Sequence, residues 1–481
     1  MEACGMSSPK ESANQRTASL FGRPSYKSLT LPLQELATLF SQPLTSTKPE
    51  PMEQATPSPP SEQPSSVHVE ICQAPMSTLR ASQMHELVRG YLMRAGALRD
   101  SVDTEFSDTV LSEHVISITI TDVPTDKYID PSSPHIRLHV YKLHDDGPST
   151  EELEEESNVS SATHWMLPAT EFHGLWESLV YDMDIKPKVM STMHVHTVNN
   201  PSPPSQLLRY VETTLLFSDR EVNSSIISWN RVVLLYGPPG TGKTSLCKAL
   251  AQKLCIRLSR RYSYGQLVEI NSHSLFSKWF SESGKLVQKM FAKITELIED
   301  PDALVCVLID EVESLTASRK ASMSGAEPSD AIRVVNALLT QLDQIRRYPN
   351  VIILTTSNIT GAIDLAFVDR ADIKQYIGYP SPAAVFKIYH SCVLELMRVG
   401  IVTPRRDVIE LRENGVTFYT QRLKLIACKS EGLSGRTLRK LPFLALSTTP
   451  HTAAIALQGF LSALDSTVDT QLGDREELAR Q

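Results

Sequence analysis

The chain has 481 residues, with 47 Lys or Arg against 55 Asp or Glu, which gives a formal net charge of −8 at pH 7. This length has room for about two or three domains, and the acidic balance excludes a global positive field that attracts nucleic acid or anionic lipid. The seven cysteines show no CxxC or metal-ligand spacing, and no signal-peptide pattern or bilayer-length apolar run is present. We therefore expect a protein of the cytosol or nucleus, with no direct nucleic-acid partner and no membrane association.

Residues 1–65 are rich in Pro, Ser, Thr and Gln and carry one modest apolar patch, at residues 29–40. A segment with so little apolar surface cannot offset the entropy cost of ordering itself. We expect a disordered Pro/Ser-rich tail. The patch is either part of that tail, the interpretation we favour, or a short helix that binds a partner.

The next segment, residues 66–185, has the pattern of a small α+β domain. Apolar residues alternate as in strands at residues 67–71, 115–120 and 136–140, and residues 84–98 can form a helix. Residues of both kinds in one short segment predict a sheet packed against a helix.

A linker and two further domains are expected after this segment. Residues 186–206 contain Asn-Pro and Pro-Pro pairs and are predicted to be the linker. Beyond it, helical patterns alternate with strand-like apolar runs at residues 232–236, 267–270, 304–309, 351–355 and 375–377. This alternation predicts an α/β domain at residues 207–380, with a parallel sheet covered on both faces and a ligand at the carboxyl edge of its strands. Only helical patterns follow, so residues 381–481 are expected to form a smaller helical lid.

A phosphate-binding loop lies between the first of these strands and the next helix. The run Gly-Pro-Pro-Gly-Thr-Gly-Lys-Thr at residues 237–244 lets backbone N–H groups point at phosphate oxygens at the positive end of a helix. Lys243 would reach the β and γ phosphates, and the Thr244 hydroxyl would hold Mg²⁺. A Gly/Pro turn before an ordinary helix is the alternative, which the strand-loop-helix context disfavours. The predicted ATP-binding residues of the loop are Gly237, Pro238, Pro239, Gly240, Thr241, Gly242, Lys243, Thr244 and Ser245.

Two adjacent acids, Asp310 and Glu311, end the apolar run at residues 304–309. Because this strand should end beside the phosphates, Asp310 is expected to hold a water of the Mg²⁺ shell, with Thr244 as the other metal-binding residue. Glu311 is expected to orient and deprotonate the attacking water. In the alternative the pair caps a strand into solvent, but the phosphate loop independently requires such acids.

Three further polar residues are candidates for the reaction. Asn358 follows the strand at residues 351–355 and could bind the nucleophilic water or the γ-phosphate, although Asn by itself is common where strands end in turns. Arg370 and Arg436 are candidate cations for the charge that develops on the γ-phosphate, although an isolated Arg is usually a surface residue. Together with Glu311, these three residues are the predicted catalytic set.

The order of the motifs resembles that of the AAA+ ATPases: the phosphate loop, Asp310-Glu311, Thr-Ser-Asn358 and Gly-Arg436. A closer resemblance is to the pachytene checkpoint protein 2 family, and it covers about residues 66–185 and 207–475. The segments that carry this closer resemblance are residues 139–148, 164–182, 265–285, 327–336 and 431–445.

The resemblance implies a hexameric ring that uses ATP to remodel HORMA-domain proteins, which a comet-type adaptor delivers. It implies that residues 66–185 recognise the substrate, and that the protein acts in checkpoint silencing and in meiotic recombination and synapsis. It also implies a nuclear and cytoplasmic protein that associates with chromosomes and kinetochores. In this family pattern Asn358 is the first sensor, Arg436 is the second, and Arg370 is a finger inserted into the neighbouring subunit's site.

The run Ser-Lys-Trp-Phe-Ser at residues 277–281 resembles an AAA+ central-channel loop. The resemblance makes Trp279 and Phe280 the substrate-gripping residues, with Trp279 pulling an extended segment by apolar contact. A Trp buried in the core is the general expectation for this residue type, but the polar flanks Lys278 and Ser281 favour the loop.

Two departures from the family pattern concern single residues. Ser281 stands where many AAA+ relatives have Gly, which could alter the flexibility of the channel loop. Ala371 follows Arg370 where relatives carry a second Arg, so the finger has no substitute.

Two other functions fit part of the sequence. One is a nucleotide-gated binding module for HORMA proteins, which the set of Glu311, Asn358 and Arg370 disfavours because such a module has no need of hydrolysis. The other is a different AAA+ branch such as a microtubule-severing enzyme, which residues 66–185 do not support.

Overall fold

The computed structural model describes residues 67–96, 98–123, 130–133, 135–152, 160–181, 203–223, 226–271, 283–314, 330–358, 365–404, 418–449 and 454–480. The tail predicted at residues 1–65, most of the predicted linker, and the predicted channel residues Trp279 and Phe280 lie outside these ranges. None of the helices in the described ranges is long and apolar enough to cross a membrane.

The first described unit is a four-stranded sheet with the order β2-β3-β1-β4, packed against two helices. Strand β1 pairs antiparallel with β3 and parallel with β4. Val67, Val69 and Ile71 of β1 face a core with Met84 and Val88, because alternate residues of a strand point to the same face. This confirms the expected α+β arrangement. The elements are β1 (Val67–Gln73), α2 (Ala81–Ala95), β2 (Ser101–Asp103), α3 (Thr109–His114), β3 (Val115–Thr121) and β4 (Ile136–Tyr141).

A seven-stranded sheet with the order β11-β7-β10-β9-β8-β6-β5 forms the centre of the α/β part. Its first five strands are parallel to one another, as the sequence predicts. The strands are β5 (Ser149–Glu152), β6 (Ser160–Leu167), β7 (Val232–Tyr236), β8 (Tyr264–Asn271), β9 (Ala303–Asp310), β10 (Val351–Ser357) and β11 (Ile373–Tyr376).

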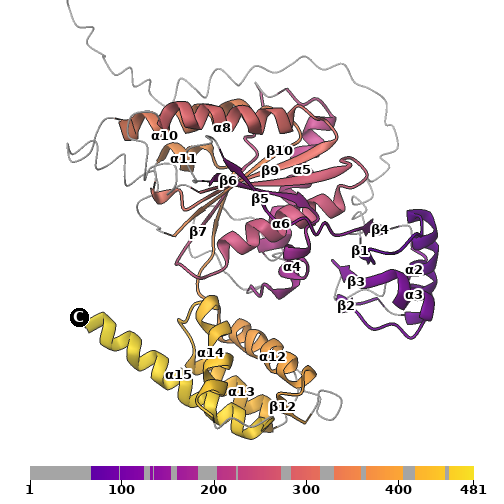
Figure 1. Ribbon diagram of the computed structural model, residues 1–481, viewed down its shortest axis with the longest axis vertical. Coiled ribbons are helices and arrows are strands. Elements are labelled where there is room, and N and C mark those ends of the chain that lie inside the picture. Colours follow the sequence, from indigo (N-terminus) through magenta and orange to yellow (C-terminus); the bar gives the residue numbers. More distant parts are fainter. Residues whose placement is uncertain are drawn as a thin grey trace, which may run out of the picture. The chain divides into compact units, whose positions relative to one another are not determined.

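Helices cover both faces of this sheet, which gives three layers (Figure 1). On β9, Val305 and Val307 face the layer of α8, α10 and α11, whereas Leu304 and Cys306 face the layer of α5 and α6. Strands buried on both faces read as continuous apolar runs, which is why the sequence located them. The helices are α4 (Leu175–Ser178), α5 (Pro203–Asp219), α6 (Lys243–Arg257), α8 (Ser283–Ile298), α10 (Asp330–Ile345) and α11 (Leu365–Arg370).

The sheet differs from the expected one at one edge. Strand β6 pairs antiparallel with β8 and with β5, so the sheet is mixed rather than purely parallel. Both strands come from residues that the sequence analysis assigned to the smaller domain at residues 66–185. They join the large sheet because β8 would otherwise be an edge strand with unpaired backbone groups. In addition, Trp165 and Leu167 of β6 bury their side chains in the core that α6 shares.

The carboxyl-terminal part is a four-helix unit with its own core, around the buried Tyr389, Leu438 and Phe460. The expectation of helices alone was wrong in one detail, since β12 pairs in parallel with β13. Strands of two residues are too short to show an alternation of apolar and polar residues in the sequence. The elements are α12 (Pro382–Arg398), β12 (Val402–Thr403), α13 (Phe418–Lys429), α14 (Gly435–Ser447), β13 (Ile455–Ala456) and α15 (Leu457–Arg480).

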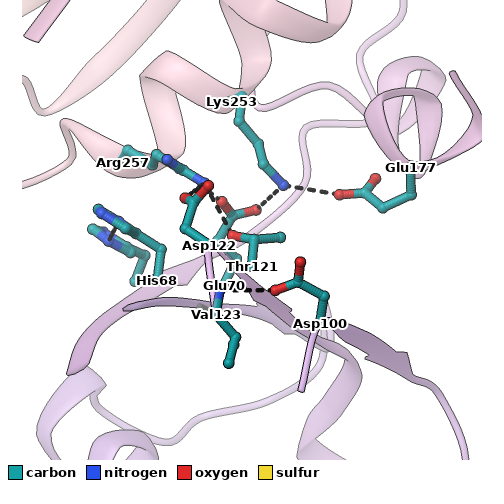
Figure 2. A network of polar contacts seen from close by, with 10 residues as sticks. His68, Glu70, Asp100, Thr121, Asp122, Val123, Glu177, Lys253 and Arg257 are labelled. Carbon is teal, nitrogen blue, oxygen red and sulfur yellow. Dashed lines mark hydrogen bonds and ion pairs between the residues drawn. The ribbon is translucent and has the colours of Figure 1, made fainter. Parts of the chain in front are cut away.

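The face of the amino-terminal sheet opposite its own helices is polar and contacts α6 (Figure 2). Glu70 of β1 accepts hydrogen bonds from Lys253 Nζ at 2.6 Å and from Arg257 Nε at 3.1 Å. Lys253 also pairs with Glu177 at 2.8 Å, and Arg257 pairs with Asp122 at 2.8 Å. The side chains of Glu70 and Lys253 are each 3% exposed, so these charges are buried and paired, as buried charges must be.

Candidate nucleotide-binding site

The loop between β7 and α6 has a backbone that only glycine allows at two positions. Gly237 has a φ of +150°, and a Cβ atom there would lie 2.1 Å from the carbonyl oxygen of Ile377. Gly240 has a φ of +76°, and a Cβ atom there would lie 2.8 Å from Ser434 Oγ. The loop therefore curls tightly at the carboxyl end of β7, immediately before the amino terminus of α6, where an anion is favoured.

Lys243 is buried at the first position of α6, and its amino group folds back on the loop. Its Nζ donates to the carbonyl oxygens of Gly237 at 3.0 Å and Pro238 at 2.8 Å. Burial lowers the pKa of Lys243, and the acidic side chains Glu313, Asp310 and Glu311, at the end of β9 and just after it, oppose this effect. A cation held by carbonyl dipoles rather than by a carboxylate is available to a phosphate group, which forms stronger charge-assisted hydrogen bonds.

Thr244 and Asp310 meet at the carboxyl end of the sheet, although 66 residues separate them in sequence. The Thr244 hydroxyl donates to Asp310 Oδ1 at 2.9 Å. A hydroxyl and a carboxylate are hard oxygen ligands of the kind that Mg²⁺ takes, usually with several waters and substrate phosphates. The residues present therefore fit a nucleotide phosphate in the loop with Mg²⁺ beside it.

Glu311 and Asn358 form the second polar pair of the site. Asn358 Nδ2 donates to Glu311 Oε1 at 2.8 Å, and the Asn358 backbone N–H donates to Glu313 Oε1 at 2.9 Å. Parallel neighbours β9 and β10 end at the same edge, so the residues that follow them are brought together. A carboxylate is thus oriented by an amide donor next to the loop and the Thr244–Asp310 pair.

Arg436 lies next to the loop at the start of α14. Its backbone N–H donates to the carbonyl oxygen of Gly240 at 3.1 Å. Ser434 caps the same helix by accepting a hydrogen bond from the Thr437 N–H at 3.2 Å. The amino terminus of a lid helix therefore faces the phosphate loop, together with the predicted second sensor.

Arg370, the predicted finger, contacts helix α10 and its own helix α11. At the end of α11 it forms a two-pronged pair with Asp343 of α10, with Nε–Oδ1 at 3.1 Å and Nη2–Oδ2 at 2.8 Å, and it also donates to the Ala366 carbonyl oxygen at 2.8 Å. Partial burial opposes the charge of Asp343, but the Arg370 guanidinium lowers the pKa of that carboxyl.

Comparison with known proteins decides the family. Residues 233–379 match the ATPase family associated with various cellular activities (AAA), residues 381–472 match the TRIP13-like AAA+ ATPase lid C-terminal domain, and residues 62–146 match the TRIP13 N-terminal domain. Pachytene checkpoint protein 2 homolog of Homo sapiens is 57% identical over 427 residues, which cover 86% of this chain and 95% of the human protein. The chain belongs to the pachytene checkpoint protein 2 family of AAA+ ATPases.

Other members of the pachytene checkpoint protein 2 family agree. The homologue of Danio rerio is 53% identical over 421 residues, covering 86% of this chain and 95% of that protein. The solved structure of C. elegans PCH-2 is 37% identical, covers 85% of this chain and 100% of its own, and superposes with a TM-score of 0.67. The chain is accordingly an AAA+ ATPase with a lid and an amino-terminal domain of this family's type.

The structure also brings to the ATPase site residues that sequence reasoning missed. The hydroxyl of Thr356 lies between Asp310 and Glu311, and Glu313 binds the backbone of Asn358. Thr356 belongs to the recognised Thr-Ser-Asn motif and Glu313 lies two residues after Glu311, but nothing in the pattern distinguishes their roles. Tyr181 is the third residue that was missed. Its hydroxyl donates to the Gly242 carbonyl oxygen at 3.4 Å, although the two residues are 61 apart in sequence. No local signal links that tyrosine to the loop.

Proposed function

We propose that this protein is a ring-forming remodeller that partially unfolds HORMA-domain proteins with the energy of ATP hydrolysis, converting closed conformers to open ones. The observation that carries the proposal is the joint presence of the phosphate loop, the Thr244–Asp310 pair and the Glu311–Asn358 pair at one sheet edge, in a chain of the pachytene checkpoint protein 2 family. A module that only binds nucleotide has no need of an oriented carboxylate beside the loop.

In the proposed reaction each residue has a defined task. Lys243 exchanges its carbonyl partners for phosphate oxygens. Thr244, and Asp310 through a water, would hold Mg²⁺, which would supply positive charge to the phosphates. Glu311, oriented by Asn358 Nδ2, takes a proton from the attacking water on a carboxylate oxygen. Arg436 contributes a cation from the lid side of the loop, so that lid position and phosphate state are linked.

In the proposed ring, each site receives a further cation from the neighbouring subunit. Asp343 of α10 holds the Arg370 guanidinium at the end of α11, and we assign Arg370 to the site of the neighbouring subunit in a homo-hexamer. Hydrolysis then depends on ring assembly, because each site is complete only with the next subunit in place. Trp279 and Phe280, at residues outside the described ranges, are assigned to the channel that grips the substrate.

The amino-terminal sheet is the proposed recognition unit for the HORMA protein and its comet-type adaptor. We place the protein in the nucleus and cytoplasm, at chromosomes and kinetochores, with roles in checkpoint silencing and in meiotic recombination and synapsis. Membership of the pachytene checkpoint protein 2 family and the match of residues 62–146 support this assignment.

The test is a purified conversion assay with a closed HORMA protein, its adaptor and ATP, followed by chromatography or NMR. Glu311→Gln should bind ATP and assemble without turnover, and Trp279→Ala should hydrolyse ATP without conversion. Trp279→Phe, which keeps an aromatic side chain, is the matched control and should retain most conversion. Conversion at the normal rate by Trp279→Ala, or with a non-hydrolysable ATP analogue, would overturn the proposal; the second outcome would instead indicate a nucleotide-gated binding module.

A further inference from the structure

Thr356 is buried at the carboxyl end of β10, two residues before Asn358, and its side chain is not used in the mechanism above. The residue is 1% exposed and lies in register with Leu235 of β7. Leu235 precedes Tyr236, the last residue of β7 before the phosphate loop. Its neighbour Thr355 is in register with Ile309 of β9, the residue before Asp310. Thr356 therefore sits where the strand of the phosphate loop and the strand of the acids both end.

One hydroxyl group serves both acids. Thr356 Oγ1 donates to Asp310 Oδ1 and accepts a hydrogen bond from the backbone N–H of Glu311 at 3.1 Å. A threonine hydroxyl has one donor and can also accept, so a single atom links the Asp310 side chain to the Glu311 backbone. Neither valine nor alanine can supply either bond.

The backbone at Glu311 needs such support. Its φ is +56°, in the left-handed region that residues other than glycine rarely adopt and that must be stabilised by the surroundings. Thr356 provides two of the contacts at this turn, because its hydroxyl accepts from the Glu311 N–H and its carbonyl oxygen accepts from the Val312 N–H at 3.0 Å. The direction in which the Glu311 side chain leaves the strand depends on this turn.

Asp310 has a second hydroxyl partner, but that one has another proposed use. Thr244 donates to the same Oδ1 atom at 2.9 Å and is also the predicted Mg²⁺ ligand. Thr356 lies on the sheet rather than on the nucleotide loop, so its bond to Asp310 does not depend on what the loop holds.

We propose that the Thr356 hydroxyl is a positioning group that sets the Asp310 carboxylate and the Glu311 turn together, so that the metal-binding acid and the water-activating acid move as one unit. The proposal rests on the roles assigned to Asp310 and Glu311 in the proposed function. It predicts that removing the hydroxyl weakens both Mg²⁺ use and turnover, while nucleotide still enters the loop.

The decisive comparison is Thr356→Ser against Thr356→Ala in the full-length protein, because the two shortened side chains differ only in the hydroxyl. We expect Thr356→Ala to lower kcat by about 10–100-fold, the usual effect of removing a partner of a metal-binding group. The Mg²⁺ concentration that gives half of the Mg²⁺-dependent fluorescence change of bound mant-ADP should rise by a similar factor. Binding of mant-ADP without Mg²⁺ should stay within about twofold of wild type, and Thr356→Ser should stay close to wild type in all three measurements.

Thr355→Val is the control for the loss of a buried hydroxyl from the same strand. Thr355 is 2% exposed, and its hydroxyl donates to the Val233 carbonyl oxygen of β7 at 2.9 Å, whereas the Thr356 hydroxyl bonds to Asp310 of β9. It should lower thermal stability without raising the Mg²⁺ requirement. The proposal is overturned if Thr356→Ala and Thr356→Ser have the same kcat and Mg²⁺ requirement, or if Thr355→Val raises that requirement as much as Thr356→Ala.

Glu311→Gln separates this proposal from the one on which it rests. If Glu311→Gln turns over ATP normally, the assigned role of Glu311 is wrong. If Glu311→Gln is inactive while Thr356→Ala behaves as wild type, only the role of Thr356 is wrong.

Discussion

The two ends of helix α6 both carry buried cations, but they hold them in different ways. At the amino-terminal end Lys243 donates to the carbonyl oxygens of its own loop. At the carboxyl-terminal end Lys253 and Arg257 are bound by carboxylates, chiefly Glu70 of the amino-terminal sheet. A phosphate can replace the carbonyl partners of Lys243, because these are weak partners for a cation. The carboxylate partners of Lys253 and Arg257 are too strong to be replaced in this way.

The difference shows how one helix can serve a ligand and a fold at once. Cations are favoured near the carboxyl terminus of a helix and anions near the amino terminus, so Lys253 and Arg257 are well placed for internal carboxylates. Burial opposes the charge of Arg257, yet Glu70 and Asp122 outweigh burial and raise its pKa. The comparison predicts that changes at one end abolish nucleotide use, whereas changes at the other end loosen the amino-terminal sheet.

The largest effect is expected at the amino-terminal end. Lys243→Ala should abolish measurable turnover and weaken nucleotide binding by about 10–100-fold, because each hydrogen bond from a charged group contributes about 1.5–3 kcal/mol. Mant-nucleotide titration and phosphate release measure the two quantities. Intact turnover in this variant would remove the basis for the whole assignment of the site.

The next largest effect is expected at the other end. Glu70→Ala leaves Lys253 and Arg257 buried with fewer carboxylates, and losing one partner of a buried pair costs about 3–5 kcal/mol. We expect a lower thermal midpoint and faster hydrogen exchange in β1 and α6, with nucleotide binding retained. Arg94→Gln breaks the Arg94–Asp108 pair, in which the Arg94 side chain is 63% exposed, and should change nothing measurable. Equal behaviour of the two variants would contradict the buried-pair interpretation.

The histidine pair beside this network predicts a dependence on pH. His68 Nδ1 and His139 Nε2 lie 3.0 Å apart, and burial, with Arg257 next in importance, lowers the pKa of His68 to about 3 and that of His139 to about 4. The unfolded chain takes up protons below pH 6.5 while the folded chain does not, so stability is full above that pH and falls as the pH drops towards 4.

Between pH 6.5 and 5.5 the loss should be about 1 kcal/mol for each ring. The thermal midpoint of His68→Gln/His139→Gln should therefore fall less over this interval than that of wild type. Parallel curves for the two proteins would show that the rings do not titrate as inferred. The charged and titratable groups that act on the two rings are Arg257, Arg137, Lys253, Arg260 and His85.

A smaller change in stability is expected from Arg257→Lys. The guanidinium donates to Glu70, Thr121 and Asp122 at once, which a single ammonium group cannot match. A loss of about 1 kcal/mol is expected, seen as a small drop in the thermal midpoint with faster exchange confined to β1 and β3. If exchange around the phosphate loop rises as much, the two ends of α6 are not independent.

The elements of the candidate nucleotide site were predictable from the sequence because their signals are local. The glycines, Lys243 and Thr244 lie within one short run, and Asp310 and Asn358 follow continuous apolar strands that the sequence pattern locates. Parallel strands end at one sheet edge, so the meeting of these residues follows from the strand pattern alone. Short runs of this kind also indicated the family.

Contacts between distant segments were not predictable. The antiparallel pairing of β6 with β8 joins residues about 100 apart, and the Glu70–Lys253 pair joins residues 183 apart. The pairing of Arg370 with Asp343, and the hydroxyl of Thr356 between two acids, depend on side-chain directions that no residue pattern records.

The sequence by itself determined the phosphate loop and the parallel sheet edge of the candidate nucleotide site, since backbone curvature and strand burial are properties of neighbouring residues. Only the tertiary structure decided which buried charges neutralise each other and which hydroxyl contacts both acids. Those outcomes depend on atoms being brought within about 3 Å of each other, and it is the packing of whole elements that sets such distances.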